Sequence, residues 1–426
     1  MNKLNNIIRL IKTKLQLFWV LGLNILSYLI TFSGSVIYVR LLPKVDYGVY
    51  SFSYNIISLF MLVNGLGVAS GLLQFVSKYQ DDNLKRESYL RVAFIVGGAF
   101  NLLLAFAIIS YAYYFNLPIA NSQKLLILMA FLPFFRLYID LFQAYLRATS
   151  QNMLQSKFIL YNNILIILFG FIGVYLYGIY GLVISTYLAY IMIFVVSKIY
   201  LGLPKIFYQL AQSRLLNIRE FITYSFFSSL SNAFSGLVFI LDILLLGYII
   251  HSPDIIANYK VASVIPFAIN FIPTVIMNYY YPNVVRVSND YVALHKLQKQ
   301  LTLYMLVLTG SMSLFLIIFA KYIIVYIFGT SYADSVLPFQ ILSFGFWIIA
   351  SFRTVNGNII AALGLIKTSL MVTTVNLFIN IILTFYLVQK YSIVGASIAV
   401  VAMYIISSLM GVIIYHRYLH KMVKMR

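Results

Sequence analysis

The stretch PFFRLYIDLFQAYLR, residues 133–147, is strongly apolar and yet carries polar side chains at regular spacing. Successive residues of an α-helix are turned by about 100°. Four polar side chains therefore share one narrow stripe, and apolar residues cover the rest of the helix. The stripe consists of Arg136, Asp140, Gln143 and Arg147. If this helix lies in lipid, the stripe needs a polar environment to face.

The composition of the chain indicates that the helix does lie in lipid. Of 426 residues, 62% are hydrophobic and 9% are charged, whereas about 25% of the residues in a soluble domain are charged. The absence of cysteine excludes thiolate catalysis, disulfides and cysteine-ligated metals. The net charge of +20 does not indicate nucleic-acid binding, because the positive residues lie between hydrophobic segments. The sequence predicts a polytopic membrane protein.

The hydrophobic pattern predicts an all-α protein with about twelve transmembrane helices, because about 20 helical residues cross a hydrocarbon core of roughly 30 Å. The apolar run that follows the basic N-terminus is longer than a signal-peptide core and is interpreted as the first, uncleaved span. Prolines and glycines are expected to kink the eighth span and loosen the second. The predicted spans are 15–39, 47–76, 92–115, 125–147, 158–177, 182–201, 220–249, 259–281, 301–320, 336–362, 369–388 and 395–415.

Lysine and arginine are distributed unequally between the two ends of these spans. If the N-terminus is cytoplasmic, 22 of the 30 fall on the cytoplasmic side and six on the outer side. Positive residues favour the cytoplasmic side of a membrane. The pattern therefore predicts that both termini are cytoplasmic and that the protein resides in the cytoplasmic membrane.

The two halves of the chain are related, which predicts two pseudo-symmetric six-helix bundles. Residues 41–54 and 249–264 both join an apolar helix end to a polar turn with Pro and Asp and then to a Tyr. Residues 144–157 and 358–370 occupy matching places after the fourth and tenth spans. We expect an N-terminal bundle over 1–201, a cytoplasmic amphipathic linker over 202–219 and a C-terminal bundle over 220–426. Internal repeats of this kind are common in transporters that rock two bundles around a central site.

The sequence resembles a known family at several points along its length. Arg40-Leu41-Leu42, Asp46-Tyr47-Gly48, the glycines Gly65 and Gly67, and Lys78 follow the pattern that opens the Wzx-type flippases. The similarity continues in DILLLGYII (242–250), FGTSYADSVLPFQIL (328–342), AALG (361–364) and YSIVGASIA (391–399). The chain is therefore similar to the polysaccharide-biosynthesis transporters of the multidrug/oligosaccharidyl-lipid/polysaccharide exporter superfamily.

This resemblance implies a substrate and partners that composition and periodicity do not reveal. The expected activity moves an undecaprenyl-diphosphate-linked oligosaccharide from the cytoplasmic to the outer leaflet for a surface polysaccharide such as capsule or the O-antigen of lipopolysaccharide. A polysaccharide polymerase and a chain-length regulator are implied partners, besides membrane lipids. No cofactor or metal is expected, and no enzymatic activity.

Ionisable residues inside the spans are the candidate functional residues, because a charge in the bilayer is costly and faces the interior of the bundle. We expect Arg353, Arg136 and Lys260 to form the cationic wall of a central cavity, since arginine binds a diphosphate through two parallel hydrogen bonds. Asp140 and Asp242 are candidate acids. The neutral lining is expected to include Asn24, Tyr28, Thr31, Ser231, Ser235, Asn356, Asn376 and Asn380.

Each candidate has an alternative, purely structural interpretation. Arg136 and Asp140 are four residues apart and either neutralise each other as a helix pair or serve the cavity. Asp242 either couples transport to protons or pairs structurally. Lys260 either binds substrate or extends its ammonium to the interface, and the Ser, Thr and Asn stripes serve either helix packing or substrate contacts. Arg353, with no acid within one turn, is the strongest single candidate.

Two other functions compete with the flippase. An ion-coupled exporter of drugs or small solutes in the same superfamily is expected to have acids within the N-terminal spans, and only Asp140 qualifies. A membrane polymerase or transferase needs a large outer loop or a catalytic His or acid pair, and the sequence has neither. The excess of intramembrane cations favours an anionic substrate.

Overall fold

The computed structural model describes residues 2–79, 81–200, 217–288 and 290–424, and the residues described form helices without a strand. The chain folds into two compact units. Unit 1 comprises Met1–Leu42 and Ile56–Ala233, and unit 2 comprises Pro43–Asn55 and Phe234–Arg426. The predicted linker lies almost entirely in residues 201–216, outside the described residues, so the predicted domain boundaries stay a prediction.

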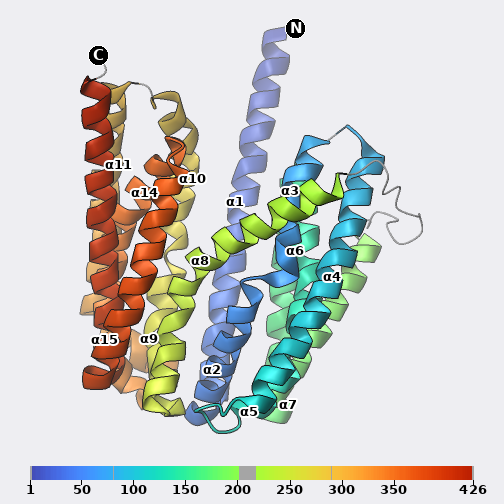
Figure 1. Cartoon of the computed structure of the whole chain (residues 1–426), viewed down its shortest axis with the longest axis vertical. Helices are drawn as coiled ribbons and strands as arrows, with labels where there is room; N and C mark the ends of the chain where they lie inside the picture. The colour runs from blue at the N-terminus through green and yellow to red at the C-terminus, as the bar shows by residue number, and fades with distance from the viewer. Residues whose placement is uncertain (1, 80, 201–216, 289, 425–426) are drawn as a thin grey trace. The chain divides into compact units, whose positions relative to one another are not determined.

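In unit 1, the helix α6 contacts three other helices, α3, α4 and α7 (Figure 1). The helices of this part of the chain are α1 (Asn2–Leu41), α2 (Lys44–Met61), the 3₁₀ turn η1 (Asn64–Gly67), α3 (Val68–Lys78), α4 (Asn83–Tyr114), α5 (Ser122–Met129), α6 (Leu132–Ala148), α7 (Asn152–Tyr200) and α8 (Ile218–Ile250). The helices α2 and α8 are each divided between the two units.

In unit 2, the helix α13 likewise contacts three other helices, α9, α11 and α15. Its remaining helices are α9 (Pro253–Ala268), α10 (Phe271–Arg286), α11 (Tyr291–Ile318), α12 (Ala320–Ile323), the π-helix η3 (Ile324–Phe328), the 3₁₀ segment η4 (Thr330–Ser335), α13 (Val336–Ile348), the π-helix η5 (Ile349–Arg353), α14 (Thr354–Ala362) and α15 (Ile366–Lys424).

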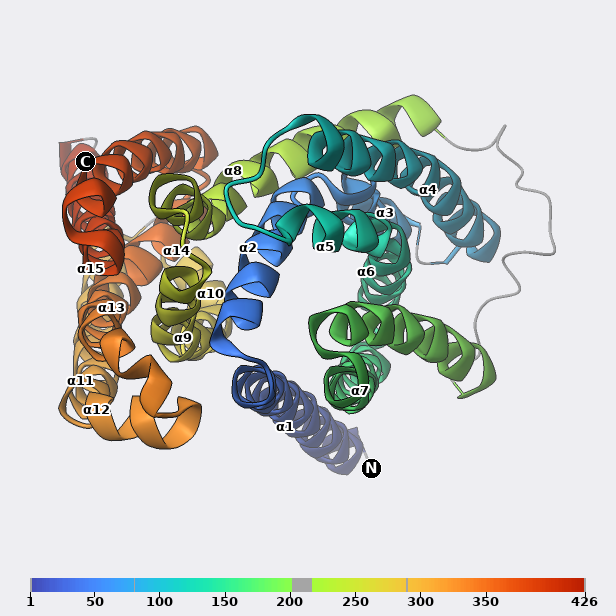
Figure 2. The same cartoon turned by 90° about the horizontal axis from the view of Figure 1, so that it is seen from below.

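Two of the long helices contain a chain reversal. In α7, a Cβ atom on Gly181 would lie 1.9 Å from the carbonyl oxygen of Gly173. In a straight helix residues eight apart are separated by about 12 Å. The chain therefore turns back near Gly178, where φ is 57° and ψ is −136°, and Figure 2 shows the two antiparallel segments of α7. The same reasoning applies to α15, where Gly395 meets the carbonyl oxygen of Leu387.

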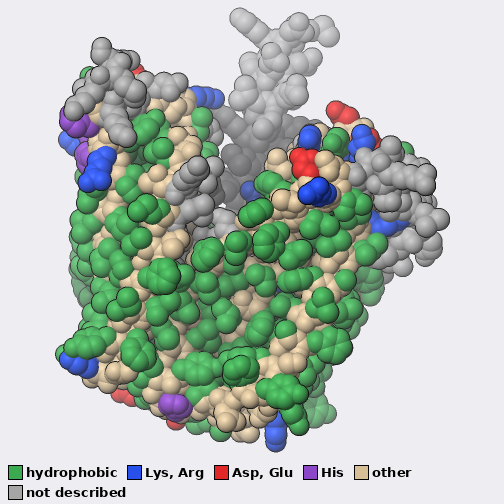
Figure 3. All heavy atoms as spheres, viewed as in Figure 1, with side chains coloured by type: hydrophobic (Ala, Val, Ile, Leu, Met, Phe, Trp, Pro, Cys, Tyr) green, Lys and Arg blue, Asp and Glu red, His purple; other side chains and the backbone are tan. Residues whose placement is uncertain are grey.

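The described residues contain eight helices that are long and apolar enough to cross a membrane, or nine if the bent pair α5–α6 is one span. The reversals in α7 and α15 correspond to the predicted pairs 158–177/182–201 and 369–388/395–415. On the face drawn in Figure 3, hydrophobic side chains cover the long middle of each unit, and charged side chains lie toward its ends. The chain is thus a multi-pass membrane protein; the exact total of twelve spans stays a prediction.

Two matching helix ends support the internal repeat. After α6, the N–H of Gln151 donates to the carbonyl of Leu146 at 2.8 Å, and Ser150 has a φ of 59°. After α14, the N–H of Leu365 donates to the carbonyl of Ile360 at 3.2 Å, and Gly364 has a φ of 73°. Both are 6→1 closures of a helix by a left-handed residue. These ends lie in the segments 144–157 and 358–370 that the sequence pairs.

The helix starts of the two halves match as well. Asp82 precedes α4 with a φ of −109° and accepts a hydrogen bond from the N–H of Lys85. Asp290 precedes α11 with the same φ and accepts from the N–H groups of Val292 and Ala293. A side-chain oxygen at this position satisfies N–H groups that the first turn of a helix leaves open.

Two predicted spans differ in detail from the helices. The fourth is bent rather than straight, because α5 and α6 meet at 44° and Pro133 lies in the first turn of α6. The eighth span begins at Pro253 rather than near 259, since proline and an acidic residue in the first turn favour a helix start. Lys260 therefore lies about two turns inside α9, not at its entrance.

Candidate functional site

Arg136 and Asp140 form an ion pair on α6. The Nε atom of Arg136 donates to Oδ1 of Asp140 at 3.0 Å. The two side chains remain 36% and 29% exposed, so the pair is accessible from one side. The structure thus shows the helix pair that was one of the two interpretations of Arg136 and Asp140. Pairing leaves a substrate role open, because an accessible guanidinium can exchange one anionic partner for another.

The second oxygen of Asp140 connects this pair to two asparagines on other helices. Asn64 of η1 donates from Nδ2 to Oδ2 of Asp140 at 2.9 Å. Asn101 of α4, which is fully buried, donates from Nδ2 to Oδ1 of Asn64 at 2.7 Å and to the carbonyl of Pro133 at 2.8 Å. Sequence analysis missed both asparagines. The Asn-Gly-Leu-Gly stretch at 64–67, inside an apolar span, was the available signal.

The asparagine network ends on a break in the second span. Gly65, Leu66 and Gly67 have φ values of 55°, 56° and 75°, which is the left-handed region that favours glycine. The N–H of Gly65 donates to Oδ1 of Asn101 at 2.8 Å. A backbone break within a membrane requires such replacement partners. The glycines predicted to loosen this span therefore mark an ordered interruption held by a side-chain amide.

Arg353 lies at the end of η5, directly after α13. In this π-helix the backbone N–H of Thr354 donates to the carbonyl of Ile349, five residues earlier, and the Thr354 hydroxyl donates to the same carbonyl at 3.0 Å. The guanidinium lies over Gly357, where an added Cβ would come 3.0 Å from Nη1. Among the described residues, the structure gives Arg353 no ion pair and no side-chain hydrogen bond. Short π-helical segments are frequent at functional sites.

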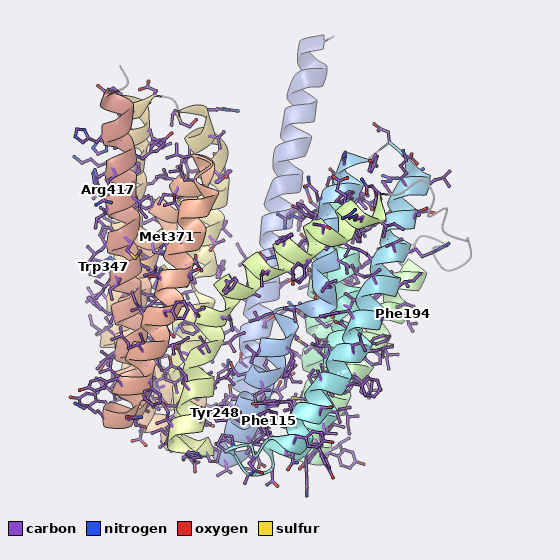
Figure 4. All side chains as sticks on the ribbon, in the orientation of Figure 1. Phe115, Phe194, Tyr248, Trp347, Met371 and Arg417 are labelled. Carbon is purple, nitrogen blue, oxygen red and sulfur yellow. The ribbon has the colours of Figure 1, made fainter. Side chains whose placement is uncertain are left out.

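The neighbours of Arg353 serve mainly to hold helices together. Asn356 is fully buried, donates from Nδ2 to the carbonyl of Phe352 at 2.9 Å and accepts from Gln298 of α11 at 3.3 Å. Trp347, labelled in Figure 4, donates from its indole N–H to the carbonyl of Leu306 at 3.1 Å. These contacts favour the packing interpretation for Asn356.

Lys260 is half-buried on α9. Its backbone carbonyl accepts a hydrogen bond from the hydroxyl of Ser263 at 2.9 Å. Within the part of the chain that the structure describes, its ammonium group has no hydrogen-bond or ion-pair partner. A lysine so placed retains its capacity to bind an anion.

Asp242 of α8 is the most deeply buried of the predicted acids, at 2% exposure. The hydroxyl of Tyr259 donates to its Oδ2 at 3.4 Å, a long contact, and Asn380 and Tyr404 of α15 lie beside the carboxyl. Several buried polar atoms here have no hydrogen-bond partner among the described residues. They are Oδ1 of Asp242, Nδ2 and Oδ1 of Asn380, and the hydroxyl of Tyr404, with Oδ1 of Asn376 and Oγ1 of Thr384 one turn away along the same face of α15.

Such an accumulation is unusual, because buried polar groups are almost always hydrogen-bonded. The Asp242 cluster, meaning Asp242, Tyr259, Asn376, Asn380, Thr384 and Tyr404, offers one carboxylate with neutral oxygen donors around it. Oxygen donors of this kind suit a proton or a hard cation. Among the described residues, no group of three or more His, Cys, Asp or Glu side chains is arranged so that it could hold a metal ion.

The predicted stripe on α1 has a mixed role. Asn24 donates to Oγ of Ser156 on α7 at 3.2 Å and thus packs one helix against another. Thr31 donates to the carbonyl of Ser27 in its own helix at 2.9 Å, and Tyr28 is 53% exposed. The side chains of Ser231 and Ser235 lie outside the described residues. Lining of a shared cavity by these residues therefore stays a prediction.

Comparison with solved structures defines the class of the protein. The chain is similar to the inward-facing conformation of a multidrug-resistance MATE family transporter of the MOP superfamily, with a TM-score of 0.76 and 12% identity over 93% of this chain and 96% of that one. It is also similar to the lipid II flippase MurJ in an inward closed conformation, with a TM-score of 0.73 and 15% identity over 95% and 89%. The protein is an all-α membrane protein with the fold of the MOP-superfamily transporters.

Sequence comparison identifies the family. Residues 16–288 match the family model described as polysaccharide biosynthesis protein, which is more than half of the chain. The chain belongs to this family. Over its length it is also 23% identical to an uncharacterised membrane protein of Methanocaldococcus jannaschii, covering 93% of this chain and 84% of that protein.

Proposed function

We propose that this protein is a flippase for an undecaprenyl-diphosphate-linked oligosaccharide in the cytoplasmic membrane. Its family supports a role in polysaccharide biosynthesis, and its fold supports a transporter. The observation that carries the proposal is Arg353, an arginine at the end of the π-helix η5 in unit 2 with no anionic partner among the described residues. A cation in a membrane span marks a substrate path by default.

Arginine suits this substrate because its planar guanidinium forms parallel hydrogen bonds to diphosphate oxygens. Arg353 and Lys260 supply positive charge in unit 2, and Arg136 supplies it in unit 1. Hydroxyl and amide side chains provide hydrogen bonds for the sugar. No covalent step is needed, since the substrate changes leaflet and not its bonds; the protein acts as a transporter rather than an enzyme.

The Asp242 cluster supplies the proposed coupling site. A buried carboxylate with unpartnered oxygen neighbours binds a proton or a monovalent cation from one side of the membrane and releases it on the other. The energy for net transport then comes from the ion gradient. This role deepens the coupling interpretation of Asp242 made from sequence.

A second candidate function is export of drugs or small solutes, because the chain also shares its fold with a multidrug-resistance transporter. The two functions differ in the charge of the transported molecule. Arg353 and Lys260, which have no anionic partner in the part of the chain that the structure describes, favour an anionic headgroup over a cationic drug.

The test uses the purified full chain in liposomes that contain a fluorescent polyprenyl-diphosphate disaccharide. A membrane-impermeant reductant bleaches only the outer leaflet, so flipping extends bleaching beyond that fraction. We expect flipping by the wild type, none by Arg353→Glu, and normal flipping by Arg147→Glu, the same charge reversal at an exposed arginine at the end of α6. Flipping by Arg353→Glu at the wild-type rate would overturn the assignment. Ion-driven ethidium transport without lipid flipping would establish the second function instead.

A further inference from the structure

The asparagine network on α6, η1 and α4 has the geometry of a relay between an anion site and a backbone break. Oδ1 of Asp140 binds the guanidinium of Arg136, and Oδ2 binds the amide of Asn64. Each oxygen of one carboxylate thus contacts a different element. A change of partner at Oδ1 therefore shifts the carboxylate of Asp140 and alters its hydrogen bond to Asn64.

We propose that Asp140 is an internal competitor for the diphosphate of the substrate at Arg136, and that Asn64 and Asn101 position Asp140 so that exchange of the two anions is coupled to the break at Gly65–Gly67. This inference rests on the proposed function, because it assigns the diphosphate to Arg136. Asn64 and Asn101 act through Asp140 and are positioning residues; they do not contact the substrate.

Competition is possible because of the accessibility of the pair. Both side chains are about one-third exposed, so an anion can reach the guanidinium, and a partly exposed pair is broken at lower cost than a fully buried one. A diphosphate carries more charge and more acceptor oxygens than one carboxylate, and it binds the guanidinium in bidentate fashion. When the diphosphate occupies Arg136, Asp140 loses its cationic partner and retains Asn64.

The coupling runs through directly bonded groups. Asn64 bonds Asn101, and Oδ1 of Asn101 accepts from the N–H of Gly65. The break also packs tightly against α6, since a Cβ on Gly65 would lie 2.5 Å from Cδ1 of Leu137, the residue after Arg136. Movement of Asp140 or of this part of α6 therefore alters the support of the left-handed segment.

The natural absence of cysteine gives a clean reporter. Leu66→Cys places one thiol inside the break, at a residue whose φ is as unfavourable for leucine as for cysteine. The rate of maleimide labelling in the purified full chain is measured with and without inorganic pyrophosphate, whose affinity is measured by calorimetry. We expect pyrophosphate to change the labelling rate by about fivefold or more, the usual lower size of an allosteric coupling.

Two variants separate competition from relay. Asp140→Asn removes the competing charge and keeps an acceptor for Asn64, so we expect pyrophosphate to bind about two- to fivefold more tightly. Asn64→Ala keeps the ion pair and cuts the relay, so pyrophosphate should still bind while the labelling rate of the reporter thiol no longer responds. Gln143→Ala, on the same stripe of α6 but outside the network, is the control and should behave as the wild type in both assays.

The inference is overturned if Asp140→Asn binds pyrophosphate equally or more weakly, or if Asn64→Ala retains the labelling response. If Asp140→Asn does not fold, Arg136→Gln replaces it: this variant removes the anion site, so loss of the labelling response to pyrophosphate supports the relay, and an unchanged response contradicts it. The proposed function is tested separately. Loss of pyrophosphate binding only in Arg353→Gln, with normal lipid flipping in Arg136→Gln, sinks this inference and leaves the flippase intact. If the wild type binds pyrophosphate and shows the labelling response but does not flip lipid, the proposed function fails and this inference stands.

Discussion

Gly178 in α7 and Ser392 in α15 have the same backbone conformation, with φ and ψ of 57° and −136° in one and 52° and −128° in the other. Each lies where two antiparallel helices meet. Three residues later, Gly181 and Gly395 each pack against a carbonyl oxygen eight residues earlier. The two halves thus make the same turn, Gly-Ile-Tyr-Gly in one and Ser-Ile-Val-Gly in the other. The same separation along the chain also relates Ser150 to Gly364 at the preceding helix ends.

Ser392→Gly is expected to stabilise the protein by up to about 2 kcal/mol. A residue with a Cβ at positive φ and strongly negative ψ, a region that glycine favours, costs of order 1–3 kcal/mol, and the greater freedom of glycine in the unfolded chain offsets about 0.4–1 kcal/mol of the gain. Gly178→Ser should destabilise the protein by a similar amount, because it is the reverse exchange at the matching position. The measurement is the free energy of unfolding in detergent. A loss of stability in Ser392→Gly would show that the turn is not strained by its serine.

Alanine at Gly181 or Gly395 is expected to destabilise the corresponding hairpin by about 1–3 kcal/mol, the usual cost of overpacking. The added Cβ would lie 1.9 Å from the carbonyl oxygen of Gly173 or 2.0 Å from that of Leu387, and a backbone oxygen cannot rotate away. Gly22→Ala is the control, because no atom lies within 4 Å of its added Cβ. Equal stability of Gly181→Ala and Gly22→Ala would contradict the close approach of the two helices.

These turns also show what periodicity can and cannot predict. The hairpins were predictable, because a polar or glycine turn between two apolar runs of sufficient length marks a reversal. The bend in the fourth span could not be predicted, since the sequence is apolar on both sides of it and Pro133 is the only signal. The early start of α9 was hidden by Asp254, which is polar in composition yet favourable in the first turn of a helix.

In the candidate site, only contacts between residues of the same helix could be predicted from the sequence. Arg136 and Asp140 are four residues apart, so their pairing follows from helix geometry alone. Asn64 and Asn101 join them only because η1, α4 and α6 meet, and nothing in the spacing of one segment indicates such a meeting. The Asp242 cluster combines α8, α9 and α15 for the same reason. Residue type predicted its acid and two amides, whereas Tyr259 and Tyr404 required the structure.

The cap of α4 should make stability depend on acidity. The N–H of Lys85 donates to Asp82 and holds the pKa of that carboxyl below its usual value. A lowered pKa stabilises the folded state above the ordinary value near about 4, and this contribution is lost as pH falls through the lowered one. We expect Asp82→Asn, which keeps a capping oxygen, to reduce the decrease in melting temperature between neutral and strongly acidic pH. Asp81→Asn is the neighbouring control, and an equal effect of both variants would exclude the cap as the cause.

Asp242→Asn is expected to abolish ion-driven transport without unfolding the protein. Asparagine matches the shape of aspartate and keeps the bond to Tyr259, but it neither takes up a proton nor attracts a cation. Lipid flipping is measured in liposomes with and without a sodium or proton gradient. We expect the wild type and the control Asp254→Asn, which removes an acid at the start of α9, to respond to the gradient, and Asp242→Asn not to respond. A gradient response in Asp242→Asn would rule out the Asp242 cluster as the coupling site, and a response to only one of the gradients in the wild type would identify the ion.

Gly357→Ala tests whether the geometry of Arg353 matters in addition to its charge. The added Cβ would lie 3.0 Å from Nη1 of Arg353, so the guanidinium must shift by a few tenths of an ångström or more. Alanine is also more favourable than glycine in a helix by about 1 kcal/mol, so the fold should be retained.

If bidentate binding of the diphosphate limits transport, Gly357→Ala and Arg353→Lys should both lower the flipping rate by about tenfold. This is the effect of losing roughly 1.4 kcal/mol of binding, and neither variant changes the net charge of the site. Gly98→Ala, whose added Cβ makes only an ordinary contact with Phe134 at 3.8 Å, should flip lipid at the wild-type rate. If Arg353→Lys and Gly357→Ala are as active as the wild type while Arg353→Glu is inactive, Arg353 acts as a point charge, and the bidentate contact is excluded.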